Sequence, residues 1–313
     1  MITFISSVFP SPNQAQLNAL YSWDLARIPV ILLGPLKDPA GVLSRFQNVT
    51  HVPDVKTASD LGYNSNTPII SDMIFKACNI VRSQLVAFIN GDIIVKTNFK
   101  QSAEKMAIKY GFGPFYSGLR NDVVKYDVSS RLENFGMIPC SKELPSQKGP
   151  YTTFSDQIGF EKCFWNGGRW ICPSKQEDRI TFWGLGDKSD CFLEAPVIDS
   201  AQKINGLSGI IHQGFSGDIF IGSKETFEQM LLNMPQFLLG RMFWDNWIHL
   251  YFSGLKKCYQ CSKSLPIFHF PHGYDHVDSE KDTLDHNRRI FVGSFKGTVP
   301  QMVNLNDWEE AKI

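Results

Sequence analysis

The sequence predicts an α/β fold built on a mostly parallel, Rossmann-like sheet that is flanked by helices. Short apolar runs, typical of strands buried on both faces, alternate with helical segments over the first 110 residues. Gly, Pro and Asn residues separate these segments and mark the turns. Of the 313 residues, 43% are hydrophobic and 20% are charged, as in an ordinary globular protein. We therefore expect a single domain with a less regular middle insertion.

The first 33 residues form the beginning of a βαβ unit. Residues 2–8 are an apolar run that ends before Pro10 and predicts a buried strand. Asn13 is a suitable N-cap for a helix over residues 15–23, and residues 29–33 predict a second buried strand. Two strands joined by a helical crossover pair in parallel, so this unit predicts a parallel sheet.

The alternation of strands and helices continues to residue 109. A short third strand is expected at residues 50–54. Thr67 then has the features of an N-cap, and Pro68 those of a first helical residue, for a helix with apolar residues at helical spacing. A strand at residues 85–89 and a helix over residues 99–109 complete this half.

Regular elements are harder to assign beyond residue 110. Residues from about 140 to 175 are rich in Pro, Ser, Lys, Gly and aromatic residues, and we interpret residues 126–209 as an irregular insertion. Order returns with a strand at residues 217–222, a helix over 224–232 and an aromatic helix over 242–252. A strand at residues 265–268 follows.

Charge, cysteine content and hydropathy restrict the class of protein. Lys+Arg 31 balances Asp+Glu 31, so no global field favours nucleic acid or acidic lipid. Seven scattered cysteines are an odd number, which argues against a disulfide framework and for a reducing compartment. We find neither a signal peptide nor an apolar run of the ~18 residues that a spanning helix needs. These features predict a cytoplasmic protein without nucleic-acid partner or transmembrane segment.

A carboxylate interrupts one of the most apolar stretches of the chain. The run Leu85–Ile89 is followed by Asn90, Gly91 and Asp92, and residues 93–95 resume an apolar strand. A carboxylate between buried strand segments is costly unless it is paired or holds a cation. Ligands of open α/β sheets bind at the carboxyl ends of strands, so Asp92 is a candidate metal ligand. The alternative is a loop aspartate that caps a turn.

Histidines gather in the C-terminal part of the chain. They occupy positions 269, 272, 276 and 286, and histidine with carboxylate is a usual ligand set for Zn²⁺ or Mn²⁺. An α/β sheet can bring a C-terminal loop to a strand end, so Asp92 is a possible partner. A purely structural histidine-rich loop is the alternative. Cys258 and Cys261 have the spacing of half a zinc site, but two buried thiols fit better because no second pair follows.

Asp245 lies near the start of the aromatic helix, among Phe243, Trp244 and Trp247. Aromatic surroundings raise the pKa of a carboxyl group, which then suits a general base. Alternatively, backbone amides at the helix N-terminus satisfy the carboxylate. Arg120 and Arg241 each fit either a surface ion pair or a clamp on phosphate oxygens.

Several common nucleotide and nucleophile motifs are missing from the sequence. It contains no GxxxxGK[ST], GxGxxG or GxSxG segment. Their absence weighs against a P-loop kinase, a nicotinamide dehydrogenase and an α/β-hydrolase.

Five segments of the sequence, taken in order, resemble segments of GT-A-type glycosyltransferases. Three of them carry a motif: NxD in residues 88–95, GRxxWDNW in 239–247 and an HxxHxYxH-like pattern in 269–276. The other two are residues 64–68 and 217–222. The resemblance covers about residues 2–125 and 210–290. In such proteins a DxD motif ends a strand and holds a divalent cation that bridges the diphosphate of a nucleotide-sugar. Here Asn90 takes the first position, so the metal site would depend more on Asp92.

The resemblance implies a division of the chain and a reaction. Residues 1–125 would be the nucleotide-sugar-binding half, 126–209 a possible acceptor region, 210–290 the acceptor and catalytic half, and 291–313 a peripheral tail. The sugar, a hexose or pentose, would move to a hydroxyl of a glycan, lipid-linked or protein-linked acceptor in glycan biosynthesis.

The resemblance also implies roles for individual residues. Mn²⁺ or Mg²⁺ would be held by Asp92 with His269 and His272, and Asp245 would act as the base, which implies inversion. Contacts to the donor nucleotide-sugar would come from Ser6, Phe9, Asn90, Arg120, Asp218 and Arg241.

Two other functions stay open on the sequence. A sugar nucleotidyltransferase uses the same kind of sheet, but residues 8–12 lack the Gly-rich loop that such enzymes carry after the first strand. A non-catalytic carbohydrate-binding relative is the other, with Asn90 marking the loss of metal chemistry.

Overall fold

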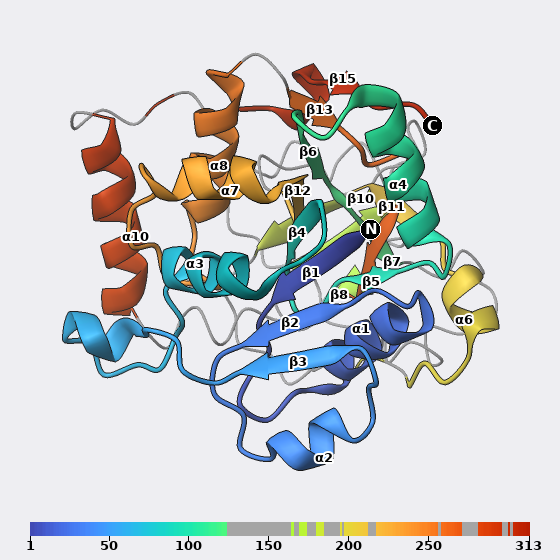
Figure 1. Cartoon of the computed structure of the whole chain (residues 1–313), viewed down its shortest axis with the longest axis horizontal. Coiled ribbons are helices and arrows are strands. Elements are labelled where there is room, and N and C mark those ends of the chain that lie inside the picture. The colour runs from blue at the N-terminus through green and yellow to red at the C-terminus, as the bar shows by residue number, and fades with distance from the viewer. Residues whose placement is uncertain are drawn as a thin grey trace.

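The computed structural model describes residues 1–123, 164–165, 169–173, 180–184, 195, 197–211, 217–255, 258–270, 281–295, 300 and 303–313. An eight-stranded sheet forms its centre (Figure 1). In spatial order the strands are β15 (Glu309–Glu310), β13 (Cys258–Gln260), β6 (Phe115–Gly118), β12 (Ile219–Ser223), β4 (Leu85–Ile89), β1 (Ile2–Ser6), β2 (Val30–Leu33) and β3 (Val49–Val52). β12 is antiparallel to both of its neighbours, and all other pairings in this sheet are parallel. The predicted α/β class with a mostly parallel sheet is confirmed.

Helices cover both faces of this sheet. Successive strand residues point to opposite faces, so Phe4 joins one apolar core and Ile5 the other. The first core lies under α1 (Gln14–Leu25) and α4 (Phe99–Tyr110). The second core lies under α3 (Ile70–Ile80), α7 (Lys224–Leu231), α8 (Trp244–Ser253) and α10 (Lys281–Ser294). Burial on both faces explains why these strands are continuous apolar runs in the sequence.

The remaining described helices are short. They are α2 (Pro39–Leu43), α6 (Ala201–Asn205) and the 3₁₀ turns η1 (Ala58–Leu61) and η4 (Leu305–Asp307). Across the described ranges, no helix has both the length and the apolar character that crossing a membrane requires.

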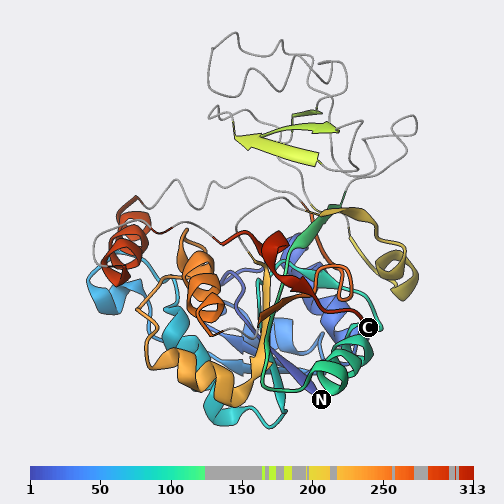
Figure 2. The same cartoon turned by 90° about the horizontal axis from the view of Figure 1, so that it is seen from above.

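Two smaller sheets complete the described structure. A four-stranded sheet has the order β11 (Gly209–Ile211), β7 (Arg120–Val123), β14 (Ile267–His269) and β5 (Ile94–Val95). A three-stranded antiparallel sheet of β8 (Phe164–Trp165), β9 (Arg169–Pro173) and β10 (Ile180–Gly184) belongs to the middle segment. Figure 2 shows it outside the body that the other two sheets form.

The carboxyl ends of β1 and β4 form the switch point of the main sheet. From β1 the chain proceeds to β2 and β3 on one side, and β4 then pairs with the other side of β1. Open α/β sheets bind ligands at such a point. The two strand ends are joined by Ser6, whose Oγ donates a hydrogen bond to the carbonyl oxygen of Ile89 at 2.7 Å.

Local capping signals predict one helix start correctly and another wrongly. Asn13 caps α1, and its side chain and that of Gln16 form a reciprocal capping box. The start predicted at Thr67 and Pro68 is wrong, because α3 begins at Ile70. Ile69 instead forms an isolated β-bridge with Leu238, so tertiary pairing holds this backbone in an extended conformation.

The described residues of the segment 291–313 lie closer to the body than we expected of a peripheral tail. Phe291 and Leu305 are fully buried, and β15 extends the main sheet by pairing with β13. The few apolar side chains of this polar segment cover the sheet edge and α8, which explains its position.

Gly91, which follows β4, lies against the backbone of Ser7, which follows β1. A Cβ atom at this position would lie 2.1 Å from the carbonyl oxygen of Ser7. We expect Gly91→Ala to lower the free energy of unfolding by about 1–3 kcal/mol, because backbone would have to move. Gly113→Ala is the matched control, since a Cβ there meets nothing within 4 Å. Urea unfolding of both variants checks this, and equal stability of the two would contradict it.

Candidate active site

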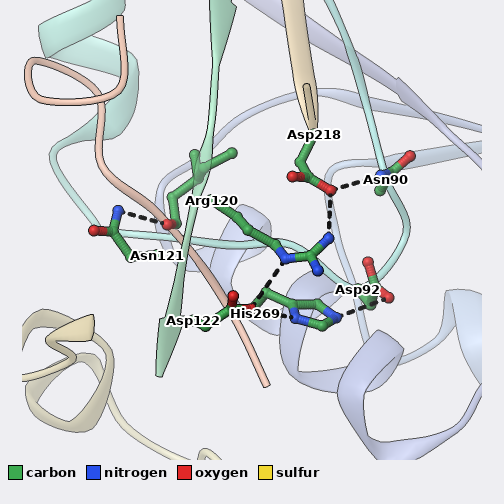
Figure 3. Close-up of polar contacts among 8 residues, drawn as sticks. Asn90, Asp92, Arg120, Asn121, Asp122, Asp218 and His269 are labelled. Carbon is green, nitrogen blue, oxygen red and sulfur yellow. Dashed lines mark hydrogen bonds and ion pairs between the residues drawn. The ribbon is translucent and has the colours of Figure 1, made fainter. Parts of the chain in front are cut away.

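Polar side chains from four elements converge beside the switch point (Figure 3). The pairing of β14 with β7 sets His269 opposite Asp122, and the backbone N–H of Asn90 donates to the carbonyl oxygen of Asp218. We call the group the acidic cluster: Asn90 and Asp92 after β4, Arg120 and Asp122 on β7, Asp218 before β12, and His269 at the end of β14.

Arg120 holds two carboxylates of the acidic cluster. Its Nε donates to Oδ1 of Asp122 at 3.0 Å, and its Nη1 donates to Oδ1 of Asp218 at 3.1 Å. Asn90 Nδ2 donates to the same Asp218 oxygen at 3.0 Å. The other oxygen, Oδ2 of Asp218, is buried and has no hydrogen-bond partner among the described residues. A buried carboxylate oxygen in this state is an acceptor that a ligand hydroxyl can satisfy.

His269 lies between two carboxylates. Its Nδ1 is 3.1 Å from Oδ1 of Asp122, and its Nε2 is 3.5 Å from Oδ2 of Asp92. Burial and the positive charge of Arg120 lower the pKa of His269, but the hydrogen bonds and charge of the two aspartates outweigh them and raise it. Without a cation, this geometry therefore favours an imidazolium that bridges Asp92 and Asp122.

The Asp92–His269 pair has the chemistry of an open metal site. A carboxylate oxygen and an imidazole nitrogen face each other, and Asp122 bonds the other ring nitrogen, as carboxylates do that orient metal-bound histidines. Among the described residues, no group of three or more His, Cys, Asp or Glu side chains surrounds one position. Two protein ligands fit a cation whose coordination is completed by substrate phosphates and water. The imidazole favours a transition metal such as Mn²⁺ over Mg²⁺.

His272, the other predicted metal ligand, lies outside the described residues. Among the described residues, Cys258 and Cys261 form no disulfide; the Cys258 thiol donates to the carbonyl oxygen of Phe252, and Cys261 is fully buried.

Asp245 is in the first turn of α8, within electrostatic reach of the acidic cluster. Burial raises its pKa to about 7, and the negative charge of Asp218 adds to the rise. The backbone N–H of Asn246 and the charge of Arg120 oppose that rise only partly. A carboxyl group with a pKa near neutrality is suited to accept a proton at physiological pH.

Ser6, Phe9 and Arg241 are the other residues that we predicted to contact a donor. Ser6 is fully buried and bonded to Ile89, so a ligand at the switch point would meet Phe9 rather than the Ser6 hydroxyl. Phe9 follows β1 and is 41% exposed. Arg241 is buried, and its guanidinium donates to the hydroxyls of Thr283 at 2.6 Å and Thr67 at 3.5 Å.

Asp122 is a site residue that the sequence analysis missed. It contacts both Arg120 and His269 and is almost fully buried. The available signal was the spacing of Arg120 and Asp122, which places both on one face of a strand.

The chain resembles solved structures but matches no protein-family profile and no curated protein. Among solved structures, it is similar to S. aureus TarS 1–349 in complex with UDP-GlcNAc, with a TM-score of 0.49 and 8% identity over 96% of this chain and 68% of that one. TarS 1–349 in complex with UDP gives a TM-score of 0.29 and 10% identity over 44% of this chain and 41% of that one. The bifunctional IspDF from Campylobacter jejuni gives a TM-score of 0.26 and 10% identity over 40% of this chain and 35% of that one.

The raised pKa of Asp245 predicts a stability effect that depends on pH. The pKa in the folded protein, about 7, lies above the unfolded value, so the folded state retains a proton that the unfolded chain loses. Stability from the protonated form is complete below about pH 4 and is lost as pH rises to 7. Asp245→Asn should therefore stabilise the protein by on the order of 2–4 kcal/mol at about pH 8 and far less at about pH 4.5.

Thermal unfolding at both pH values measures this difference. Asp282→Asn, which changes an exposed aspartate of α10, is the control and should have no such pH-dependent effect. An equal change in melting temperature at both pH values for Asp245→Asn would rule out the perturbed carboxyl group.

Proposed function

We propose that this protein is a nucleotide-sugar-dependent glycosyltransferase of the GT-A type. It would move a sugar from a nucleotide-diphosphate sugar to a hydroxyl of a glycan, lipid-linked or protein-linked acceptor. The observation that carries the proposal is the position of the Asp92–His269 pair and Asp218 at the switch point, with Asp245 within electrostatic reach. The NxD and GRxxWDNW segments of the sequence support the same function.

The donor would bind across the carboxyl ends of β1 and β4. Phe9 presents an exposed ring beside this edge, where it can stack on the nucleotide base. Asp218 Oδ2 would accept a hydrogen bond from a ribose or sugar hydroxyl, which would satisfy its buried charge. Asn90 is bonded to the other oxygen of Asp218 and would hold that carboxylate in place.

The diphosphate would lie against Asp92 and His269, which would hold a divalent cation together with phosphate oxygens. When bound, the cation supplies positive charge that stabilises the departing diphosphate. Asp122 keeps the His269 ring in the orientation that presents Nε2 to this position. Arg120 balances the charges of Asp122 and Asp218 and prevents the two carboxylates from repelling each other.

Asp245 would act as the general base. Its carboxylate would take the proton of the acceptor hydroxyl as that oxygen forms a bond to the anomeric carbon. The bond from the anomeric carbon to the diphosphate oxygen breaks, and its electron pair leaves with the diphosphate. A single displacement of this kind inverts the configuration of the sugar.

Donor binding is tested by thermal stabilisation with a panel of nucleotide-sugars, with and without Mn²⁺. At about 100 times its dissociation constant, the correct donor should stabilise the protein by about 2.7 kcal/mol, a rise of several degrees. Asp92→Asn should lose the Mn²⁺-dependent part of this rise, whereas Asp54→Asn, at a carboxylate that is 97% exposed, should keep it. If no nucleotide-sugar stabilises the protein in either condition, the proposal is wrong.

Transfer itself is tested at Asp245. Asp245→Asn should keep the donor-induced stabilisation and lower kcat by roughly 10²- to 10⁴-fold, because the acceptor proton loses its base. Release of pyrophosphate from a nucleoside triphosphate would identify a nucleotidyltransferase instead. Sugar binding whose affinity depends on neither nucleotide nor metal would identify a carbohydrate-binding protein.

A further inference from the structure

Helix α10 holds both ends of a turn that leads directly into α8. We call residues 238–243 the 238–243 turn. Asn287 of α10 is fully buried, and its Oδ1 accepts a hydrogen bond from the backbone N–H of Leu238 at 2.8 Å. Its Nδ2 donates to the carbonyl oxygens of Leu238 at 3.0 Å and Met242 at 3.1 Å. One side-chain amide therefore binds the first and the fifth residue of the turn.

Two neighbours of Asn287 hold the same turn. Thr283 Oγ1 accepts from Nε of Arg241 at 2.6 Å, and the ring of Phe291 stacks on Phe243 with centroids 5.2 Å apart. Thr283, Asn287 and Phe291 are spaced by four residues, so they form one face of the helix. All three side chains are buried.

The turn has a backbone that requires such support. Gly240 has φ 67°, and Phe243, the residue before α8, has φ 81°. A bulky non-glycine residue in the left-handed region is an outlier that persists only where the surrounding structure imposes it. Asp245 is the second residue of α8, so the conformation at Phe243 sets the direction in which this carboxyl group points.

We propose that Asn287 is a positioning residue for Asp245. By binding both ends of the 238–243 turn, it holds the first turn of α8 where Asp245 is buried within reach of the charge of Asp218. The kinetic consequence of this role rests on the proposed function, whereas the placement of Asp245 does not. A merely structural asparagine would lower overall stability and leave the surroundings of Asp245 unchanged.

A double-mutant cycle with Asp245→Asn measures the placement without an activity assay. The quantity is the gain in melting temperature from Asp245→Asn at about pH 8 minus the gain at about pH 4.5. In an Asn287→Ala background this difference should fall to less than half of its wild-type value, because the carboxyl group gains water. An unchanged difference would overturn the proposal.

Two further variants keep the cycle decisive. Ser294→Ala removes an exposed hydroxyl of the same helix, which donates to Ile290, and should leave the difference unchanged. Asn287→Ser keeps a small polar group and takes the place of Asn287→Ala if circular dichroism shows that the alanine variant does not fold. In the Asn287→Ser background the difference should likewise fall to less than half of its wild-type value, and an unchanged difference would overturn the proposal.

The kinetic experiment uses the donor and acceptor of the proposed reaction. Asn287→Ala should lower kcat roughly 10- to 100-fold, with a change in donor KM below about threefold, because the base is misplaced and the donor site is intact. The acid limb of the kcat–pH profile should move to lower pH, since a hydrated Asp245 has a lower pKa. If the wild type transfers no sugar, the proposed function fails, and the stability cycle still decides the role of Asn287.

Discussion

The candidate site depends on the guanidinium of Arg120, whose side chain is only 11% exposed. It pairs with Asp122 on its own strand and with Asp218 just before β12, so one cation links the four-stranded sheet to the start of a strand of the eight-stranded sheet. Loss of this cation would leave Asp122 with His269 and Asp218 with Asn90 as side-chain partners, and removing one member of a buried ion pair is strongly destabilising. Through Asp122 it also supports His269, and through Asp218 it fixes the partner of Asn90.

Negative charge is in excess around the acidic cluster, and this excess suits a bound cation. Four carboxylates, those of Asp92, Asp122, Asp218 and Asp245, lie near one guanidinium and one imidazole. In the protein alone, the two aspartates raise the pKa of His269, and the charge of Asp218 adds to the rise that burial causes at Asp245. A cation at Asp92 would meet the excess differently, by attraction to the carboxylate. The same excess contributes to the raised pKa of Asp245 and would attract a cation to this position.

The fold was more predictable than the site. Continuous apolar runs mark β1, β2 and β4 because both faces of these strands are covered by helices. The wrongly placed start of α3 and the closely packed segment 291–313 have a common cause. At both places the backbone or a few apolar side chains pair with a distant segment, Leu238 in one case and β13 in the other.

The sequence by itself determined the local features: the buried strand that ends at Ile89, the N-cap of α1 at Asn13, and the carboxylate of Asp92 directly after Gly91. Only the tertiary structure decided the partners. His269 meets Asp122 across 147 residues, and Asn90 meets Asp218 across 128. Hydropathy and spacing report whether a residue is buried, and in which direction it points along its own element. The order of strands and their register decide which buried polar groups meet, because those are set by packing over the whole sheet.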